Sequence, residues 1–291
     1  MILLASIPSP SSGDVEIGPI ALHAYGLMLL LGIVAATWLT GIRWTRRGGD
    51  WDLVYRVAMW GVLGGVVGAR LYHVITSWDT VNGAWWEPFA VWRGGLGIWG
   101  GITGGVLAGG WVVRRAGESV FRFMDAVAPG LLLAQAIGRV GNYFNQELFG
   151  KPTDLPWGLE IDPANRPEGY AQFDTFHPTF LYESLWNLAG VAVLLALDRR
   201  LRIKAPGLFA LYVAWYTFGR TFEELLRIDP SHEILGMRLN FWVSAIVFLL
   251  AVAAFVWSQR RPERPSQRRR REPAAPARKM AIPKGRVRQG R

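Results

Sequence analysis

Apolar residues in this chain gather into seven long blocks, which short polar segments separate. A helix needs roughly 20 mostly apolar residues to cross the hydrocarbon core of a bilayer. The blocks have about this length and cover residues 20–42, 55–76, 97–113, 121–137, 178–197, 206–226 and 239–257. The fourth block fits least well, because it contains Arg122, Asp125 and Pro129. The pattern predicts an all-α integral membrane protein with seven transmembrane helices.

The composition supports a membrane protein and limits its chemistry. Hydrophobic residues make up 51% of the chain and charged residues only 19%, which does not suit a soluble enzyme of 291 residues. The chain has no cysteine, so a disulfide, a thiolate metal site and a cysteine nucleophile are excluded. It also has no cluster with metal-ligand spacing and no phosphate-binding glycine loop, and we therefore expect no metal and no organic cofactor.

The distribution of basic residues predicts the orientation in the membrane. Short cytoplasmic loops collect lysine and arginine. Of the 32 basic residues, 24 lie in the polar segments of one side and in the C-terminal tail, seven lie on the opposite side, and Arg70 lies within a block. The N-terminus is therefore expected outside and the C-terminus in the cytoplasm. Residues 1–19 form an extracytoplasmic segment without the basic region that opens a cleaved signal peptide.

Three further regions have distinct compositions. Residues 20–257 form the membrane domain, and the long segment at about 144–177 is expected to fold as a small extracytoplasmic cap. Residues 258–291 are rich in proline and arginine, which predicts a disordered basic cytoplasmic tail. Because no aromatic residues are interleaved with its basic run, contact with anionic lipid is favoured over nucleic-acid binding. Repeated glycines in the second and third blocks predict close helix packing.

Charged and amide side chains at membrane depth mark the candidate site, because burying them in lipid is costly without a function. In the run Gly138–Gly150, Arg139 and Asn142 lie three residues apart and share a helical face, with Asn145 and Glu147 following. The run predicts a polar group at the outer edge of the bilayer.

A second charged stripe lies in the sixth block, where Arg220, Glu223 or Glu224, and Arg227 recur at helical spacing. Such a stripe is either a buried ion ladder that only joins helices, or a group that leaves one guanidinium to bind a phosphate. A third cluster places His177 before the fifth block and Tyr182 and Glu183 inside it. A histidine before a proline caps a helix as often as it catalyses, so both roles of His177 stay open.

The Gly138–Gly150 run resembles the signature of the prolipoprotein diacylglyceryl transferases. Other matches occur in that family's order: Tyr25-Gly26, Arg70, Val91–Gly95, His177-Pro178, Tyr182-Glu183, Gly219-Arg220, Glu224 and Arg227. The resemblance covers residues 20–257. It implies a multi-pass enzyme of the bacterial plasma membrane that transfers the diacylglyceryl group of phosphatidylglycerol to the lipobox cysteine thiol of a prolipoprotein signal peptide. Glycerol phosphate would be released.

The resemblance also implies roles for individual residues. Arg139 and Arg220 would recognise the phosphate and stabilise the charge that develops as it departs. Family similarity places a further set in or around the pocket: Tyr25, Asn142, Glu147, Gly150, Glu183, Glu224 and Arg227. Many relatives have a histidine before the Gly-Gly of the third block as the assigned base, but Trp99 stands there and cannot accept a proton. Three alternatives stay open: that histidine is not essential, or another group such as His177 or Glu147 removes the thiol proton, or the field of the arginines lowers the thiol pKa enough for water to remove it.

Two other classes of protein compete with this interpretation. A transporter or channel would also bury charges among glycine-rich helices, although the seven blocks show no internal repeat. A non-catalytic protein that binds anionic lipid would use the same arginines.

Overall fold

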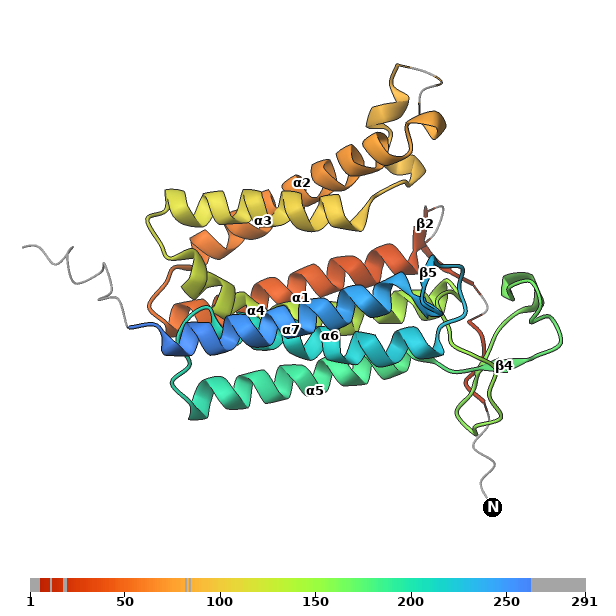
Figure 1. Cartoon of the computed structure of the whole chain (residues 1–291). Coiled ribbons are helices and arrows are strands. Elements are labelled where there is room, and N and C mark those ends of the chain that lie inside the picture. The colour runs from red at the N-terminus through yellow and green to blue at the C-terminus, as the bar shows by residue number, and fades with distance from the viewer. Residues whose placement is uncertain (1–5, 11, 18–19, 82, 84, 263–291) are drawn as a thin grey trace, which may run out of the picture. The chain divides into compact units, whose positions relative to one another are not determined.

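The computed structural model describes residues 6–10, 12–17, 20–81, 83 and 85–262 (Figure 1). Within these residues the chain forms seven long helices, and each overlaps one predicted block. They are α1 (Ala24–Arg46), α2 (Trp51–Thr76), α3 (Ile98–Arg115), α4 (Val120–Phe144), α5 (Thr179–Arg200), α6 (Gly207–Leu226) and α7 (Leu239–Arg260). The prediction of a helical membrane protein with seven long helices is therefore confirmed for the described residues.

Five of these helices are long and apolar enough to cross a membrane: α1, α2, α4, α5 and α7. The expectation that the fourth block fits least well is therefore wrong, because α4 qualifies and α3 and α6 do not. The sequence explains both exceptions. Glycines and two terminal arginines lower the apolar content of α3, and Arg220, Glu223 and Glu224 interrupt α6. Large apolar side chains are nevertheless exposed along the helices, such as Val67, Ile75 and Leu107.

Helices α2 and α3 lie side by side (Figure 1) and approach closely through glycine. A methyl group at Gly104 would lie 2.1 Å from the carbonyl oxygen of Gly64. One at Gly100 would lie 2.2 Å from the carbonyl oxygen of Gly68. These distances leave no space for a side chain, so the predicted close packing of the glycine-rich blocks is confirmed.

A proline in α4 is compensated by an arginine from α1. Pro129 has no N–H, so the carbonyl of Asp125 lacks its usual helical donor. The buried guanidinium of Arg43 supplies donors at 2.9 Å to the carbonyl oxygens of Asp125 and Ala126. The Asp125 carboxylate in turn accepts a hydrogen bond of 2.9 Å from the backbone N–H of Phe209, near the start of α6. These contacts join α1, α4 and α6 at one end of the helices.

Between α4 and α5, where the sequence predicts a cap, the chain forms a loop-rich unit with two short strands (Figure 1). Strands β3 (Leu159–Glu160) and β4 (Thr175–Phe176) pair antiparallel, and a short 3-10 helix, η4 (Pro163–Asn165), lies between them. Four buried side chains form the apolar core of this unit: Phe149, Leu159, Ile161 and Phe176. Ile7 forms a bridge to Leu159, so the N-terminal segment joins the unit, which the sequence did not indicate.

The remaining short elements lie at helix ends. Two hairpins precede α1 and α7: β1 (Asp14–Ile17) with β2 (Ile20–His23), and β5 (Glu233–Ile234) with β6 (Met237–Arg238). Between α2 and α3 the chain makes three 3-10 turns, η1 (Trp78–Thr80), η2 (Glu87–Phe89) and η3 (Val91–Arg93). Arg70 of α2 holds this loop by donating to the carbonyl oxygens of Glu87, Pro88 and Gly94 at 2.5–2.9 Å.

The C-terminal boundary differs slightly from the expected one. Helix α7 continues to Arg260, whereas the tail was expected from residue 258, because Ser258 and Gln259 still make hydrogen bonds to the helix and to Lys204. The predicted disordered tail lies almost entirely outside the described residues.

Candidate functional site

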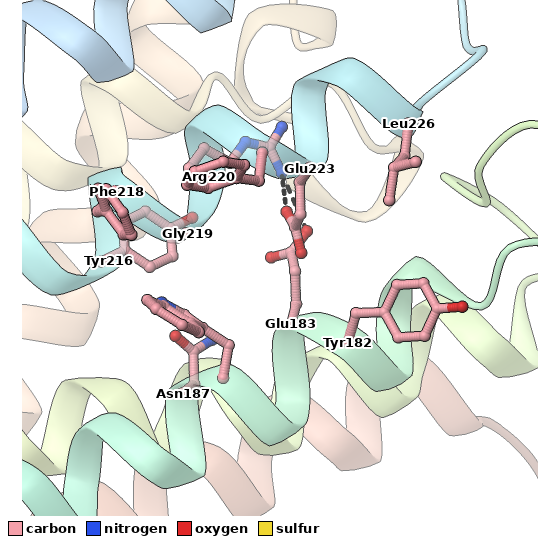
Figure 2. Close-up of a pocket in the computed structure, with 11 residues that line it drawn as sticks. Tyr182, Glu183, Asn187, Tyr216, Phe218, Gly219, Arg220, Glu223 and Leu226 are labelled. Carbon is pink, nitrogen blue, oxygen red and sulfur yellow. Dashed lines mark hydrogen bonds and ion pairs between the residues drawn. The ribbon is translucent and has the colours of Figure 1, made fainter.

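The carboxylate of Glu183 on α5 forms ion pairs with two arginines, one from each of two other helices. Its carboxylate forms an ion pair with the Nε atom of Arg139 from α4. Its second oxygen lies 3.1 Å from the Nη1 atom of Arg220 from α6 (Figure 2). All three side chains are buried for the most part, with exposed fractions of 19% for Arg139, 13% for Arg220 and 6% for Glu183. The two arginines of the candidate site are therefore brought together by one carboxylate.

Arg220 also contacts the two glutamates that follow it on α6. Its Nη1 atom lies 3.2 Å from Glu223 Oε2, and its Nη2 atom forms an ion pair with Glu224 Oε1. The spacing of three and four residues places these groups on one face of the helix. The predicted charged stripe is confirmed, and it connects to α5 through Glu183.

The stripe continues beyond α6 into the β5–β6 hairpin. Glu224 contacts Arg227 at 3.5 Å and Arg238 of β6 at 2.6 Å. Asp229 accepts two hydrogen bonds from Arg227 at 2.6 and 2.8 Å and contacts Arg238 at 2.8 Å. Burial tends to raise the pKa of Asp229, but the hydrogen bonds and charges of the two arginines outweigh it and lower this pKa below its ordinary value. These ion pairs hold the hairpin against the charged site.

The end of α4 extends the site on the other side. Arg139 donates to Asn142 Oδ1 at 3.2 Å, and Asn142 donates to Glu147 Oε1 at 2.9 Å. Asn145 donates to the same oxygen at 3.0 Å. The prediction that Arg139 and Asn142 share a face is confirmed. Glu147 is exposed and held by two amides, so it orients Asn142 rather than contacting the arginines.

Two predicted site residues pack the backbone closely. A methyl group at Gly150 would lie 2.9 Å from His177 Cβ, and the Gly150 N–H donates to the His177 carbonyl at 2.9 Å. Tyr25 of α1 lies against Gly141 of α4, where an added methyl would lie 2.6 Å from its ring. Gly150 therefore closes the cap against the start of α5, and Tyr25 joins α1 to α4 next to Arg139.

His177 lies just before α5 and next to Tyr182. Its Nδ1 atom is 3.2 Å from the hydroxyl of Tyr182, which itself accepts a hydrogen bond of 3.0 Å from Trp157 of the cap. Burial of the ring, together with the positive charge of Lys151, lowers the pKa of His177. In the described residues His177 makes no contact with the arginine cluster, so the structure brings it near the site through Tyr182.

A cavity of about 280 Å³ opens between α5 and α6 beside the arginine cluster (Figure 2). Charged residues Glu183, Arg220 and Glu223 line it together with an aromatic set: Tyr182, Trp186, Tyr216, Phe218 and Phe222. Arg139 is not part of the wall and reaches the site through Glu183. The site therefore combines an apolar space with a charged end, which matches an anionic head group that carries apolar chains.

The contacts of the charged stripe bear on its two alternative interpretations, an ion ladder and a guanidinium that binds phosphate. Among the described residues, Arg139, Arg220 and Arg227 all contact carboxylates. A buried guanidinium without an anion is costly, and these carboxylates supply the compensating charge.

Sequence patterns did not indicate several residues of the site. Arg238 and Asp229 join it only because the β5–β6 hairpin folds back on α6. Trp186 of α5 stacks on Trp215 of α6 with ring centroids 4.4 Å apart, and each indole N–H donates to the other residue's carbonyl at 3.0 Å. Gly190 and Gly219 provide the space for these rings. A tryptophan and a glycine four residues apart, on each of two neighbouring helices, is the one signal that could have suggested this pair.

The long apolar helices, together with a buried arginine cluster beside a cavity, define a helical multi-pass membrane protein with a charged internal site. The sequence matches the family described as prolipoprotein diacylglyceryl transferase over residues 14–257. This chain belongs to the prolipoprotein diacylglyceryl transferase family, whose members are enzymes of the bacterial plasma membrane.

Three similar proteins bear closely related names. Phosphatidylglycerol–prolipoprotein diacylglyceryl transferase 2 of Streptomyces coelicolor is 53% identical over 262 residues, which cover 89% of this chain and 82% of that protein. The Frankia alni transferase is 53% identical, with 88% of this chain and 68% of that protein covered. The Bifidobacterium adolescentis transferase is 47% identical, with 87% and 80% covered.

Trp99 lies near the start of α3. Its side chain is 53% exposed, and it is not among the residues that line the cavity. The group that removes the thiol proton must therefore be sought elsewhere.

Proposed function

We propose that this transferase moves the diacylglyceryl group of phosphatidylglycerol to the cysteine thiol of a prolipoprotein and releases glycerol phosphate. The observation that carries the proposal is the meeting of Arg139 and Arg220 on Glu183 beside an apolar cavity. The names of the similar proteins specify the same two substrates.

Exchange of anions explains how the arginines bind a phosphate although carboxylates already contact them. The phosphodiester of the lipid carries a negative charge and offers oxygens that a guanidinium can bind in pairs. When it enters, it takes the place of part of the Glu183 contact with Arg139 and Arg220. The carboxylates keep both arginines oriented before the lipid arrives, so little reorganisation is needed at the moment of reaction.

The reaction then proceeds as a displacement at carbon. A thiolate attacks the glyceryl carbon that bears the phosphate oxygen, a carbon–sulfur bond forms, and the carbon–oxygen bond breaks. Both electrons of that bond leave with the glycerol phosphate. Arg139 and Arg220 stabilise the negative charge that grows on the phosphate. Glu224, Arg227 and Asn142 hold these arginines in position, while Tyr25 and Gly150 pack the surrounding backbone.

The proposal also includes the number of membrane spans and their orientation. We assign seven spans, with α3 included because it packs along α2, and α6 included because its charges are paired within the protein. The distribution of basic residues supports an outer N-terminus and cap and a cytoplasmic C-terminal tail. The site would then lie close to the outer leaflet, where exported prolipoproteins arrive.

A reconstituted assay separates this activity from transport or simple lipid binding. Purified protein, phosphatidylglycerol and a synthetic lipobox peptide are mixed, and the peptide is weighed by mass spectrometry. We expect a peptide heavier by one diacylglyceryl group. In Arg139→Ala the rate should fall by ~10²-fold or more, because one donor to the developing charge is lost.

Arg56→Ala provides the matched control. Arg56 is half-exposed and pairs with Asp52 one turn away on α2, far along the chain from the cluster. Its loss should leave the rate unchanged. If well-folded wild-type protein produces no heavier peptide, the transferase assignment of this chain fails, and a transporter or lipid-binding role gains support.

A further inference from the structure

Glu223 differs from the other carboxylates of the arginine cluster in its pairing. One oxygen, Oε2, lies 3.2 Å from Arg220 Nη1. The other, Oε1, is buried and has neither a hydrogen bond nor an ion pair within the described part of the chain, whereas Glu183 Oε2 and Glu224 Oε1, which also lack a hydrogen bond, each contact an arginine. The residue is only 6% exposed, yet it lines the cavity between α5 and α6 (Figure 2). A buried carboxylate oxygen without a partner is unusual, because its desolvation is not offset.

The neighbouring carboxylates are occupied on both sides. Glu183 bridges Arg139 and Arg220, and Glu224 contacts Arg220, Arg227 and Arg238. Glu147 is held by the amides of Asn142 and Asn145. Each of these groups keeps a partner when Arg220 turns toward a bound phosphate.

Glu223 does not. Its one ion pair in the described residues is with Arg220, through the same Nη1 atom that also contacts Glu183. A phosphate that captures this nitrogen leaves the Glu223 carboxylate beside the cavity with no cation. Both oxygens of this carboxylate can then accept a proton from a group in the cavity. Binding of the lipid thus prepares Glu223 for proton transfer.

We infer that Glu223 is the catalytic base that removes the proton from the prolipoprotein cysteine. This inference rests on the proposed function, and it assigns the role that Trp99 cannot fill. Glu223 takes the proton from the cysteine sulfur, and the thiolate attacks the glyceryl carbon. As the carbon–oxygen bond breaks, the proton passes from Glu223 to the departing glycerol phosphate, and the carboxylate is restored.

The surrounding groups suit this transfer. Arg220 and Glu223 lie three residues apart on one face of α6, so the bound phosphate and the base are on the same side of the cavity. Tyr182 and Glu183 face them from α5, and Tyr216 lies one turn before Arg220 on α6. His177 is the other nearby acceptor, but its Nδ1 atom is 3.2 Å from the Tyr182 hydroxyl and outside the cavity wall.

A selenocysteine peptide tests the inference. A selenol is largely ionised at neutral pH, so it needs no base, whereas a cysteine thiol does. Glu223→Gln keeps the size and the hydrogen bond to Arg220 but cannot take up a proton. With the cysteine peptide we expect kcat to fall ~10²- to 10⁴-fold. With the selenocysteine peptide, the variant and the wild-type protein should differ by only a few-fold.

Glu224→Gln is the matched control on the adjacent residue of α6. Glu224 positions three arginines, so its loss should slow both peptides to the same extent. Retention of phosphatidylglycerol by each purified variant shows that the fold persists. Equal losses of Glu223→Gln with both peptides, or full activity with cysteine, would overturn the assignment of the base. Inactive wild-type protein with either peptide would instead remove the proposed function.

Discussion

At the scale of single residues, Arg220 connects more of the site than any one pattern in the sequence suggests. Its guanidinium contacts Glu183 on another helix and Glu223 and Glu224 on its own. The two contacts within α6 follow from helical spacing and were predicted. The contact with Glu183 depends on the packing of α5 against α6, which local spacing does not describe.

Arg220→Lys tests whether this geometry is needed in addition to the charge. A lysine ammonium is a compact charge that cannot span three carboxylates or bind a phosphate with a planar fork. We expect kcat/KM to fall by ~10²-fold, which corresponds to about 2.7 kcal/mol of transition-state stabilisation. Steady-state kinetics with phosphatidylglycerol and the lipobox peptide measure the loss. Arg56→Lys is the control, and equal effects of the two changes would contradict the role of the fork.

At the scale of elements, α4 depends on α1, because Arg43 of α1 donates hydrogen bonds to backbone carbonyls of α4. Pro129 interrupts the backbone bonds of α4, and Arg43 replaces the missing donor to the Asp125 carbonyl at 2.9 Å. The proline suggested a weak span, but the partner that compensates for it lies 86 positions earlier in the chain. A buried arginine and a proline in different blocks carry no mutual signal in one sequence.

A double-mutant cycle measures this dependence. Arg43→Met removes the donor and leaves a buried carbonyl unpaired, which should destabilise the protein by ~1–3 kcal/mol. Pro129→Ala restores an N–H four residues after Asp125, so the double variant should be more stable than the sum of the single effects predicts. The coupling is expected at ~0.5–3 kcal/mol. Thermal unfolding in detergent provides the midpoints, and strict additivity would show that Arg43 acts elsewhere.

At the scale of the whole molecule, the proposed topology places the cap outside and the α5–α6 connection inside. The absence of cysteine makes single-cysteine labelling direct. Gln172 lies exposed in the cap, and Leu201 lies exposed after α5 with a side chain 55% accessible.

In intact cells, a membrane-impermeant maleimide should label Gln172→Cys at once. Leu201→Cys should react only after the membrane is permeabilised. The two positions control for each other, because both are exposed in the folded protein. Labelling of Leu201→Cys in intact cells would reverse the orientation or remove one span from the count.

Patterns along the chain were sufficient to locate the seven helices, to show which of them carry charge, and to pair Arg139 with Asn142 and Arg220 with Glu224. These features are local: apolar length sets a helix, and the helical period places residues three or four apart on one face. Three other features required the packing of distant segments: Glu183 joins two arginines, the β5–β6 hairpin adds Arg238, and, in the described residues, Glu223 keeps one oxygen without a partner. Those contacts join segments far apart in the chain, and they depend on how side chains fill the space between packed helices.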